Sequence, residues 1–235
     1  MFEKEIQSEH LDEALTLKFY QPEEIDSIYE TNICIMQDGN DYFNLGRIAT
    51  LSDELHDDFD ITNTIFVGIH YLDRFDRREK YHPDGKQHEN YKKFLMNEVI
   101  PLIKEQLPIN PLGENWALMG DSLAGTLAFL VATQNLNTFD YVIMQSPLVD
   151  ESVIHAAEKL DLNDDLEIYH TIGLNETEVG TTIDGKIDFV TPNKRLNEIL
   201  KTKKLTYHYH ELNDGFHTWK YWQKDLPRAL KTIFN

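Results

Sequence analysis

The stretch Asn115-Trp-Ala-Leu-Met-Gly-Asp-Ser-Leu-Ala-Gly-Thr-Leu-Ala-Phe-Leu-Val-Ala132 decides the fold. Its first part, Trp116–Met119, is an apolar run of strand length. Its last part places apolar residues at the spacing of one helix face, at Leu123, Leu127, Leu130 and Val131. A strand, a turn of small residues around one serine, and a helix form the layout of a nucleophile elbow, which lifts the serine above the end of a sheet.

The turn is tight enough that the positions two before and two after its serine nearly touch, so both must be small. Gly120 meets this requirement, whereas Ala124 stands where the usual pattern has glycine and Gly125 follows one place later. We therefore predict that Ser122 is a nucleophile and that the N–H of Leu123 points at any oxyanion formed there. The alternative is a buried corner in which the serine only caps the helix.

The rest of the chain alternates between strand-like and helix-like segments. We expect strands near Ile6 and over residues 15–20, 32–36, 64–71, 116–119, 141–144, 166–173 and 205–212, and helices over 42–55, 87–107, 151–160 and 218–234. Another helix is expected to start at Pro192 with Thr191 as its cap, and a short helix is open for residues 23–29. The polar segments 72–85 and 174–189 are expected to be loops. This order predicts an α/β protein with a mostly parallel, doubly wound sheet and helices on both faces.

Composition limits the partners and the compartment. The net charge of −19 over 235 residues argues against nucleic acid or an anionic membrane as a partner, because phosphate groups need Lys and Arg to replace their counterions. Cys34, the one cysteine, lies in an apolar run and is expected to be a small core residue without a disulfide in the chain. We find no signal-like start, no membrane-length apolar run and no linker. We therefore expect a cytoplasmic protein with one domain over residues 1–235.

Catalysis by serine needs a base, and the base needs an acidic group to orient it. In a parallel sheet these groups lie beyond the carboxyl ends of the strands. His217 follows the last expected strand, where the base is expected, and Glu176 follows the strand expected over residues 166–173, where the acid is expected. Other acidic side chains in the loop of Glu176 stay open as the acid: Glu178, Asp184 and Asp188.

An oxyanion hole needs a second backbone donor besides Leu123. The turn Asp38-Gly39-Asn40 follows the third strand, and we assign the donor to the N–H of Asn40; an ordinary turn is the alternative. Two histidines, His208 and His210, share one face of a strand and could suggest a metal site, but a polar strand face explains them better. We expect neither a metal nor another cofactor.

Four segments together resemble one enzyme family. They are Gln37-Asp-Gly-Asn-Asp-Tyr-Phe43, Arg77-Arg-Glu-Lys-Tyr81, the elbow at Ser122, and Gly215-Phe-His-Thr-Trp-Lys-Tyr-Trp222. The chain is similar to the putative-esterase family of α/β-hydrolases, which contains esterase D (S-formylglutathione hydrolase), siderophore trilactone esterases, feruloyl esterases and mycolyltransferases. The last segment is the most specific, because a His-x-Trp-x-x-Trp run at the catalytic histidine is typical of these esterases. Ala124 departs from the family's Gly-x-Ser-x-Gly-Gly pattern.

The resemblance implies an α/β-hydrolase fold without a large cap domain and an acid three residues beyond a strand-end glycine, which fits Gly173 and Glu176. It implies a serine esterase that acts on a small-molecule ester through an acyl-enzyme, with thioesters and siderophore-type lactones also open. For substrate binding we name Asp38, Gly39, Arg77, Arg78, Tyr81 and Trp219. An acyltransferase with the same triad and a non-catalytic binding protein are the alternatives, and a homodimer is open.

Overall fold

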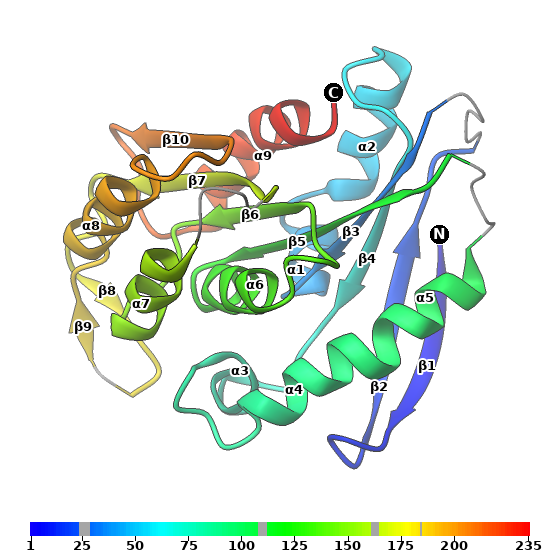
Figure 1. Cartoon of the computed structure of the whole chain (residues 1–235), viewed down its shortest axis with the longest axis horizontal. Coiled ribbons are helices and arrows are strands. Elements are labelled where there is room, and N and C mark those ends of the chain that lie inside the picture. The colour runs from blue at the N-terminus through cyan, green and yellow to red at the C-terminus, as the bar shows by residue number, and fades with distance from the viewer. Residues whose placement is uncertain (24–28, 108–111, 161–164, 184) are drawn as a thin grey trace.

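The computed structural model describes residues 1–23, 29–107, 112–160, 165–183 and 185–235 (Figure 1). Eight strands of the described part form one sheet in the order β1-β2-β4-β3-β5-β6-β7-β10. The bounds of these strands are β1 Phe2–Ser8, β2 Glu13–Tyr20, β3 Thr31–Met36, β4 Thr64–Ile69, β5 Glu114–Asp121, β6 Tyr141–Gln145, β7 Glu167–Gly173 and β10 Tyr207–Leu212. Strand β2 runs antiparallel to both β1 and β4, and the other neighbours in this sheet pair in parallel. The predicted mostly parallel α/β sheet is therefore confirmed.

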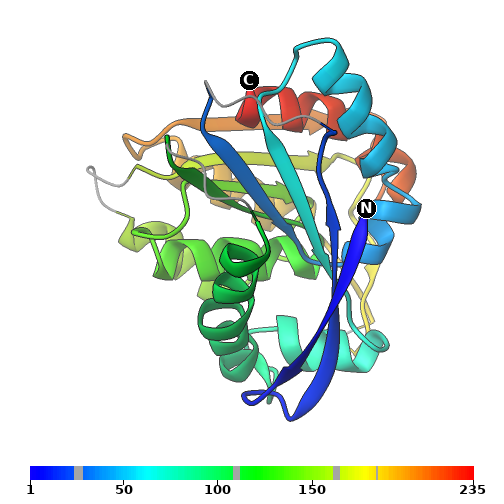
Figure 2. The same ribbon diagram turned by 90° about the vertical axis from the view of Figure 1, so that its right-hand side faces the viewer.

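Helices cover both faces of the sheet, as expected. Their bounds are α1 Gly39–Asn44, α2 Ile48–Asp57, α3 Arg74–Tyr81, α4 His88–Phe94, α5 Ile100–Gln106, α6 Leu123–Gln134, α7 Glu151–Lys159, α8 Val190–Leu200 and α9 Trp219–Phe234. Helices α2 and α9 lie on one side of the strands, and α4 to α6 lie on the other side (Figures 1 and 2). No helix in the described ranges is long and apolar enough to cross a bilayer.

The two apolar cores follow from side-chain alternation along the strands. Ile33 and Ile35 of β3 pack into the core beneath α4 to α8, whereas Cys34 and Met36 pack into the core beneath α2 and α9. Because successive side chains of a strand point to opposite faces, a strand that is apolar throughout must be covered on both. Cys34 is fully buried and unpaired, and burial raises the pKa of its thiol.

Helix α6 occupies the middle of the molecule. Ten of its twelve residues are buried, so its apolar side chains surround the helix instead of forming one stripe. It starts directly after Ser122 at the end of β5. A central strand and a fully covered helix thus hold the elbow rigidly from both sides.

Several expected boundaries were wrong for identifiable reasons. The expected loop over residues 72–85 contains helix α3, because Asp73 caps it by accepting hydrogen bonds from the N–H groups of Phe75 and Asp76. Polar residues dominate α3, so its sequence lacks an apolar stripe. The other expected loop contains a two-stranded hairpin, β8 Val179–Gly180 and β9 Lys186–Ile187.

Helix ends also differ from expectation. Asp188, rather than Thr191, supplies the side-chain acceptor at the start of α8, where it receives the N–H of Val190 at 2.8 Å. The expected helix over residues 42–55 is split into α1 and α2, and Arg47 between them is left-handed with φ of 55°. The expected helix over 87–107 continues through a π-helical turn, η1 Leu95–Val99, which ends just before Pro101. Residues 24–28, which include most of the segment where a short helix was open, lie outside the described ones.

Candidate active site

Ser122 stands in the strained turn that the sequence predicts. Its φ is 51° and its ψ is −125°, a combination that residues with a side chain rarely adopt. A Cβ atom on Gly120 would lie 2.3 Å from the carbonyl carbon of Ala124, so glycine is required at that position. The methyl group of Ala124 itself is fully buried and accommodated. The departure from the family pattern therefore leaves the elbow intact.

His217 and Glu176 lie next to Ser122, as expected from the order of the strands. The Oγ of Ser122 is 2.8 Å from Nε2 of His217, and Nδ1 of His217 is 2.6 Å from Oε2 of Glu176. The three side chains come from the ends of β5, β10 and β7. The arrangement can pass a proton from the hydroxyl to the imidazole, with the carboxylate fixing the orientation of the ring.

The other candidate acids lie elsewhere. Glu178 is exposed and its Oε2 is 3.2 Å from Nζ of Lys186, while Asp188 caps α8. Asp184 lies outside the described residues. Of the described candidates, Glu176 is the one hydrogen-bonded to His217.

Two glycines allow the loops of the acid and the base to meet. A Cβ atom on Gly173 would lie 2.6 Å from the backbone of Gly215 and 2.5 Å from Oε1 of Glu176. The N–H of Asn175 donates to the carbonyl of Gly215 at 2.9 Å. Backbone contact between these loops therefore sets the position of His217 relative to Glu176, and any larger residue would separate them.

The expected oxyanion donors begin two helices. The N–H groups of Asn40 and Leu123 lie in the first turns of α1 and α6, and neither has an acceptor within the described part of the chain. First-turn N–H groups lack partners inside their own helix, so both can bind an oxyanion. Gly39 precedes Asn40 because a Cβ there would lie 2.5 Å from Gly68 of β4.

A sequence model of the Putative esterase family matches residues 8–233. The chain belongs to that family. The uncharacterized protein YjcH of Bacillus subtilis (strain 168) is 40% identical over 231 residues, which cover 98% of this chain and 96% of that protein. Family membership supports hydrolysis of carboxylic esters.

Solved structures show the same α/β-hydrolase fold. A ferulic acid esterase matches with a TM-score of 0.79 at 14% identity, over 99% of this chain and 97% of that chain. The enterobactin esterase of Shigella flexneri matches with a TM-score of 0.79 at 16% identity, over 98% of this chain and 58% of that enzyme. The BES protein from Bacillus cereus matches with a TM-score of 0.76 at 18% identity, over 100% of this chain and 94% of that one. At these identities the likeness shows the fold alone.

In this member of the Putative esterase family, three residues expected to bind substrate form one cluster, in which Asp38 and Tyr81 are buried and Arg77 is half-buried. The guanidinium of Arg77 donates to both oxygens of Asp38, at 2.9, 2.9 and 2.6 Å. The Cζ of Arg77 lies 5.6 Å from the ring centroid of Tyr81, which is fully buried and whose hydroxyl accepts the N–H of Asp38 at 3.4 Å. The polar atoms of Asp38 and Arg77 bind one another beneath the turn that carries Asn40. The Arg77 side chain keeps 18% of its surface exposed, and a role of these residues in substrate binding stays a prediction.

Asp121, the residue before Ser122, lies in the same cluster. Its Oδ1 has no hydrogen-bond partner within the described residues. Burial, followed by the charge of Asp38, raises the pKa of Asp121 well above its usual range, although Arg77 opposes this shift. One guanidinium thus faces two buried carboxyl groups. Burial is the main reason that the charged form of Asp121 is disfavoured, and the charge of Asp38 adds to it.

Arg78 points in a different direction from Arg77. It lines a cavity of about 340 Å³ together with Leu148, Phe189 and Pro192, among others. Its Nε is buried without a partner in the described chain, and its Nη1 is 3.5 Å from Oε1 of Glu79. Phe189 also contacts His217, with 4.5 Å between ring centroids. Phe189 therefore links this cavity to the histidine, and the guanidinium of Arg78 has a donor without a partner among the described residues.

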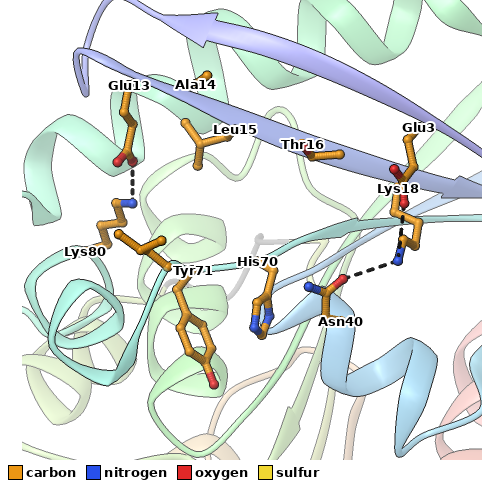
Figure 3. Close-up of a pocket in the computed structure, with 11 residues that line it drawn as sticks. Glu3, Glu13, Ala14, Leu15, Thr16, Lys18, Asn40, His70, Tyr71 and Lys80 are labelled. Carbon is orange, nitrogen blue, oxygen red and sulfur yellow. Dashed lines mark hydrogen bonds and ion pairs between the residues drawn. The ribbon is translucent and has the colours of Figure 1, made fainter.

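A second groove of about 460 Å³ is lined by other residues, and Asn40 contributes its side chain to it (Figure 3). Its charges are paired, since Lys18 is bound to Glu3 and Lys80 to Glu13 and Asp76. Burial lowers the pKa of His70, whose Nδ1 has no partner in the described part of the protein. The groove therefore offers neutral donors and acceptors.

The remaining candidates have local partners. Trp219 is half-buried and packs edge-on against Tyr42, with 4.8 Å between ring centroids. Nε2 of His208 is 2.8 Å from Oε1 of Glu167. No group of three or more His, Cys, Asp or Glu side chains in the described ranges is arranged to hold a metal ion.

Two residues in contact with the site, Ser146 and Trp222, were given no role from the sequence. Ser146 donates to Oε1 of Glu176, and Trp222 donates to Ser146. The signal for Ser146 was its place at the end of β6, and the signal for Trp222 was the second tryptophan of the His-x-Trp-x-x-Trp run. Neither pattern predicts which atoms form the hydrogen bonds, because the bonded residues are 30 and 76 positions apart in the sequence.

Proposed function

We propose that this protein is a serine esterase in which Ser122, His217 and Glu176 form the catalytic triad. The observation that carries the proposal is the unbroken hydrogen-bonded chain from Ser122 Oγ through His217 to Glu176, at 2.8 and 2.6 Å. It stands at a strained elbow, and strain of this kind collects at functional sites. A serine that only capped its helix would need neither the histidine nor the carboxylate.

In the proposed reaction the Oγ of Ser122 attacks the ester carbonyl carbon while its proton passes to Nε2 of His217. The carbonyl oxygen becomes an oxyanion and binds the N–H groups of Asn40 and Leu123. When the carbon–oxygen bond to the alcohol breaks, His217 returns the proton to the leaving alkoxide. Water then attacks the acyl-enzyme by the same route, and the carboxylic acid leaves. Glu176 holds the imidazole in the tautomer that presents Nε2 to the serine.

For substrate selection we propose that Arg78, not Arg77, contacts the ester. A guanidinium binds carboxylates and phenolates through paired hydrogen bonds, and Arg78 has donors left for them beside apolar walls. Two of the carboxylates lining the same cavity, Asp150 and Asp188, cap helices α7 and α8. This chemistry favours an ester with an apolar or aromatic body and an anionic group.

The structural neighbours suggest which substrates to test first. Their names point to ferulic acid esters and to enterobactin, and both compounds carry aromatic groups. A panel of p-nitrophenyl esters of increasing chain length, with a ferulate ester, S-formylglutathione and a catechol trilactone, covers the alternatives. We expect measurable turnover by the wild type, and a loss of about 10³-fold or more in kcat for Ser122→Ala, because triad residues act as a unit.

Two outcomes would change the proposal. Near-wild-type turnover by a folded Ser122→Ala variant would remove this serine from the mechanism. Faster release of an ester than of free acid, when an added alcohol competes with water, would indicate acyl transfer by the same triad.

A further inference from the structure

Trp222 lies in the first turn of α9 and its indole reaches the acid of the site through one serine. Its Nε1 is 3.1 Å from the Oγ of Ser146, and that Oγ is 2.7 Å from Oε1 of Glu176. All three residues are buried, with 4%, 0% and 1% of their surface exposed. Water therefore cannot easily replace any of these contacts.

The direction of both hydrogen bonds is fixed by chemistry. An indole N–H can only donate, and an ionised carboxylate can only accept. The hydroxyl of Ser146 must therefore accept from Trp222 and donate to Glu176. A hydroxyl that could otherwise rotate is left with one orientation.

Glu176 is held at both of its oxygens. Oε1 receives the hydroxyl of Ser146 and the N–H of Gly173, the latter at 2.9 Å, while Oε2 faces Nδ1 of His217. Hydrogen bonds to an ionised acceptor are stronger than those between neutral groups. The two donors on Oε1 therefore leave Oε2 as the oxygen available to His217.

The backbone of Ser146 has a strained conformation, which indicates a functional role for this residue. Its φ is 48°, which is the left-handed region that residues other than glycine seldom adopt, and such outliers cluster at functional sites. Its N–H donates to the carbonyl of Thr171 in the neighbouring strand at 2.7 Å. The strained turn points the hydroxyl away from the strand and toward Glu176.

Trp222 has a second contact with the site. Its ring packs edge-on against His217, with 4.9 Å between centroids and 85° between planes. The carbonyl of Trp222 receives Nε2 of Gln145 at 3.0 Å, which ties this turn of α9 to the end of β6. The side chain of Trp222 thus packs against the imidazole ring of His217, which restricts the movement of that ring, and it also supplies the donor that orients the hydroxyl of Ser146.

We propose that Trp222 and Ser146 are positioning residues that act in series on Glu176, a role that rests on the proposed function of Ser122. Trp222 fixes the hydroxyl of Ser146, and that hydroxyl fixes the carboxylate that orients His217. The second tryptophan of the His-x-Trp-x-x-Trp run is thereby given a physical task besides packing.

A double-mutant cycle tests the serial arrangement. Trp222→Phe removes the N–H and keeps an aromatic ring, and Ser146→Ala removes the hydroxyl. We expect each to lower kcat about tenfold with KM nearly unchanged, as for loss of a hydrogen bond within a charged network. The double variant should fall no further than Ser146→Ala alone, because the tryptophan then has no hydroxyl to orient. Trp116→Phe, a buried tryptophan far from the site along β5, is the control and should keep wild-type kcat.

The pH dependence supplies a readout that packing alone would not change. Ser146→Ala removes one donor from Glu176, and Trp222→Phe releases the hydroxyl of Ser146 from the orientation in which it donates to Glu176. In both variants the carboxylate should attract the imidazolium proton more strongly. The acid limb of kcat/KM should therefore move to higher pH in Trp222→Phe and in Ser146→Ala, and stay in place in Trp116→Phe. Ser146→Gly, which suits the left-handed backbone, serves if Ser146→Ala does not fold.

Additive losses in the cycle, or an unchanged kcat and pH limb in folded Trp222→Phe, would overturn the serial role. Failure of the proposed function is a separate result. In that case the wild type itself neither hydrolyses the ester panel nor reacts with a fluorophosphonate, whereas failure of the serial role leaves an active wild type.

Discussion

The molecule places buried carboxyl groups on both sides of Ser122 and treats them in opposite ways. On the side of β6, β7 and β10, Glu176 receives three donors, from Gly173, Ser146 and His217. On the side of β3 and α3, Asp38 and Asp121 face one guanidinium, and Asp121 has an oxygen without a partner in the described residues. A buried carboxylate that receives several hydrogen bonds can stay charged and orient a histidine, whereas Asp38 and Asp121 share one guanidinium and are better suited to hold the backbone in place. We therefore expect the side of Glu176 to serve catalysis and the side of Asp38 and Asp121 to support the turn that carries Asn40.

The largest effect is expected at Glu176. Glu176→Gln keeps the shape of the side chain but removes the charge that stabilises the imidazolium, so kcat should fall by about 10⁴-fold, as for the equivalent change in other triads. Glu178→Gln and Asp188→Asn are matched controls in the same loop and should stay close to the wild type. Steady-state kinetics on p-nitrophenyl acetate measure all three. A crippled Asp188→Asn beside an active Glu176→Gln would reverse the assignment.

The next largest effects are expected at the neighbouring residues Arg77 and Arg78, where we predict a loss of stability for the first and weaker substrate binding for the second. Removing Arg77 leaves Asp38 buried without its partner, so Arg77→Ala should lower the free energy of unfolding by about 3–5 kcal/mol. Arg78→Ala should spare stability and raise KM for anionic esters by about tenfold, without changing KM for p-nitrophenyl acetate. Urea denaturation and kinetics on both kinds of ester give the two readouts. Arg74→Ala, an exposed arginine of the same helix, should change neither. An equal loss of both kinds of activity in Arg78→Ala would make Arg78 a structural residue as well.

The smallest effect on activity is expected at Asp121. Its pKa is raised in the folded protein, so the folded state binds a proton that the unfolded state releases above about pH 4. The stability that this proton contributes is present at low pH and is lost as pH rises toward the folded pKa, with a slope of at most about 1.4 kcal/mol per pH unit. Asp121→Asn removes this slope and should become the more stable protein as pH rises, with kcat within about twofold of the wild type.

Denaturation of both proteins at several pH values between 4 and 8 measures the difference. A wild type that gained stability relative to Asp121→Asn over this range would mean that Asp121 is charged. Asp121 would then carry its charge in the folded protein as Glu176 is proposed to do, and the contrast between the two groups of carboxyl side chains would not hold.

How much of this could be read from the sequence depends on the range of the interactions. The α/β sheet followed from alternating apolar periods, and the positions of Ser122, His217 and Glu176 followed from their places after strands. The structure brings these three together, and their catalytic role stays a prediction. Helix α3 was missed because a capping aspartate and ion pairs stabilise it, which an apolar pattern does not register.

The different contacts of Arg77 and Arg78 could not be predicted from sequence spacing. Arg77 and Arg78 are adjacent, and a helix turns successive side chains in different directions. Which of them meets Asp38, 39 positions earlier, depends on how α3 packs against the end of β3. The link from Trp222 to Ser146 spans 76 positions and is likewise set by tertiary packing.

Covalent labelling tests the central claim most directly. The wild type, Ser122→Ala and Glu176→Gln are incubated with a fluorophosphonate and measured by intact mass, followed by mapping of the modified peptide. We predict one adduct per wild-type chain, placed on Ser122, much slower labelling of Glu176→Gln, and none of Ser122→Ala. A folded wild type that stays unlabelled, or an adduct that persists in Ser122→Ala, would contradict the account.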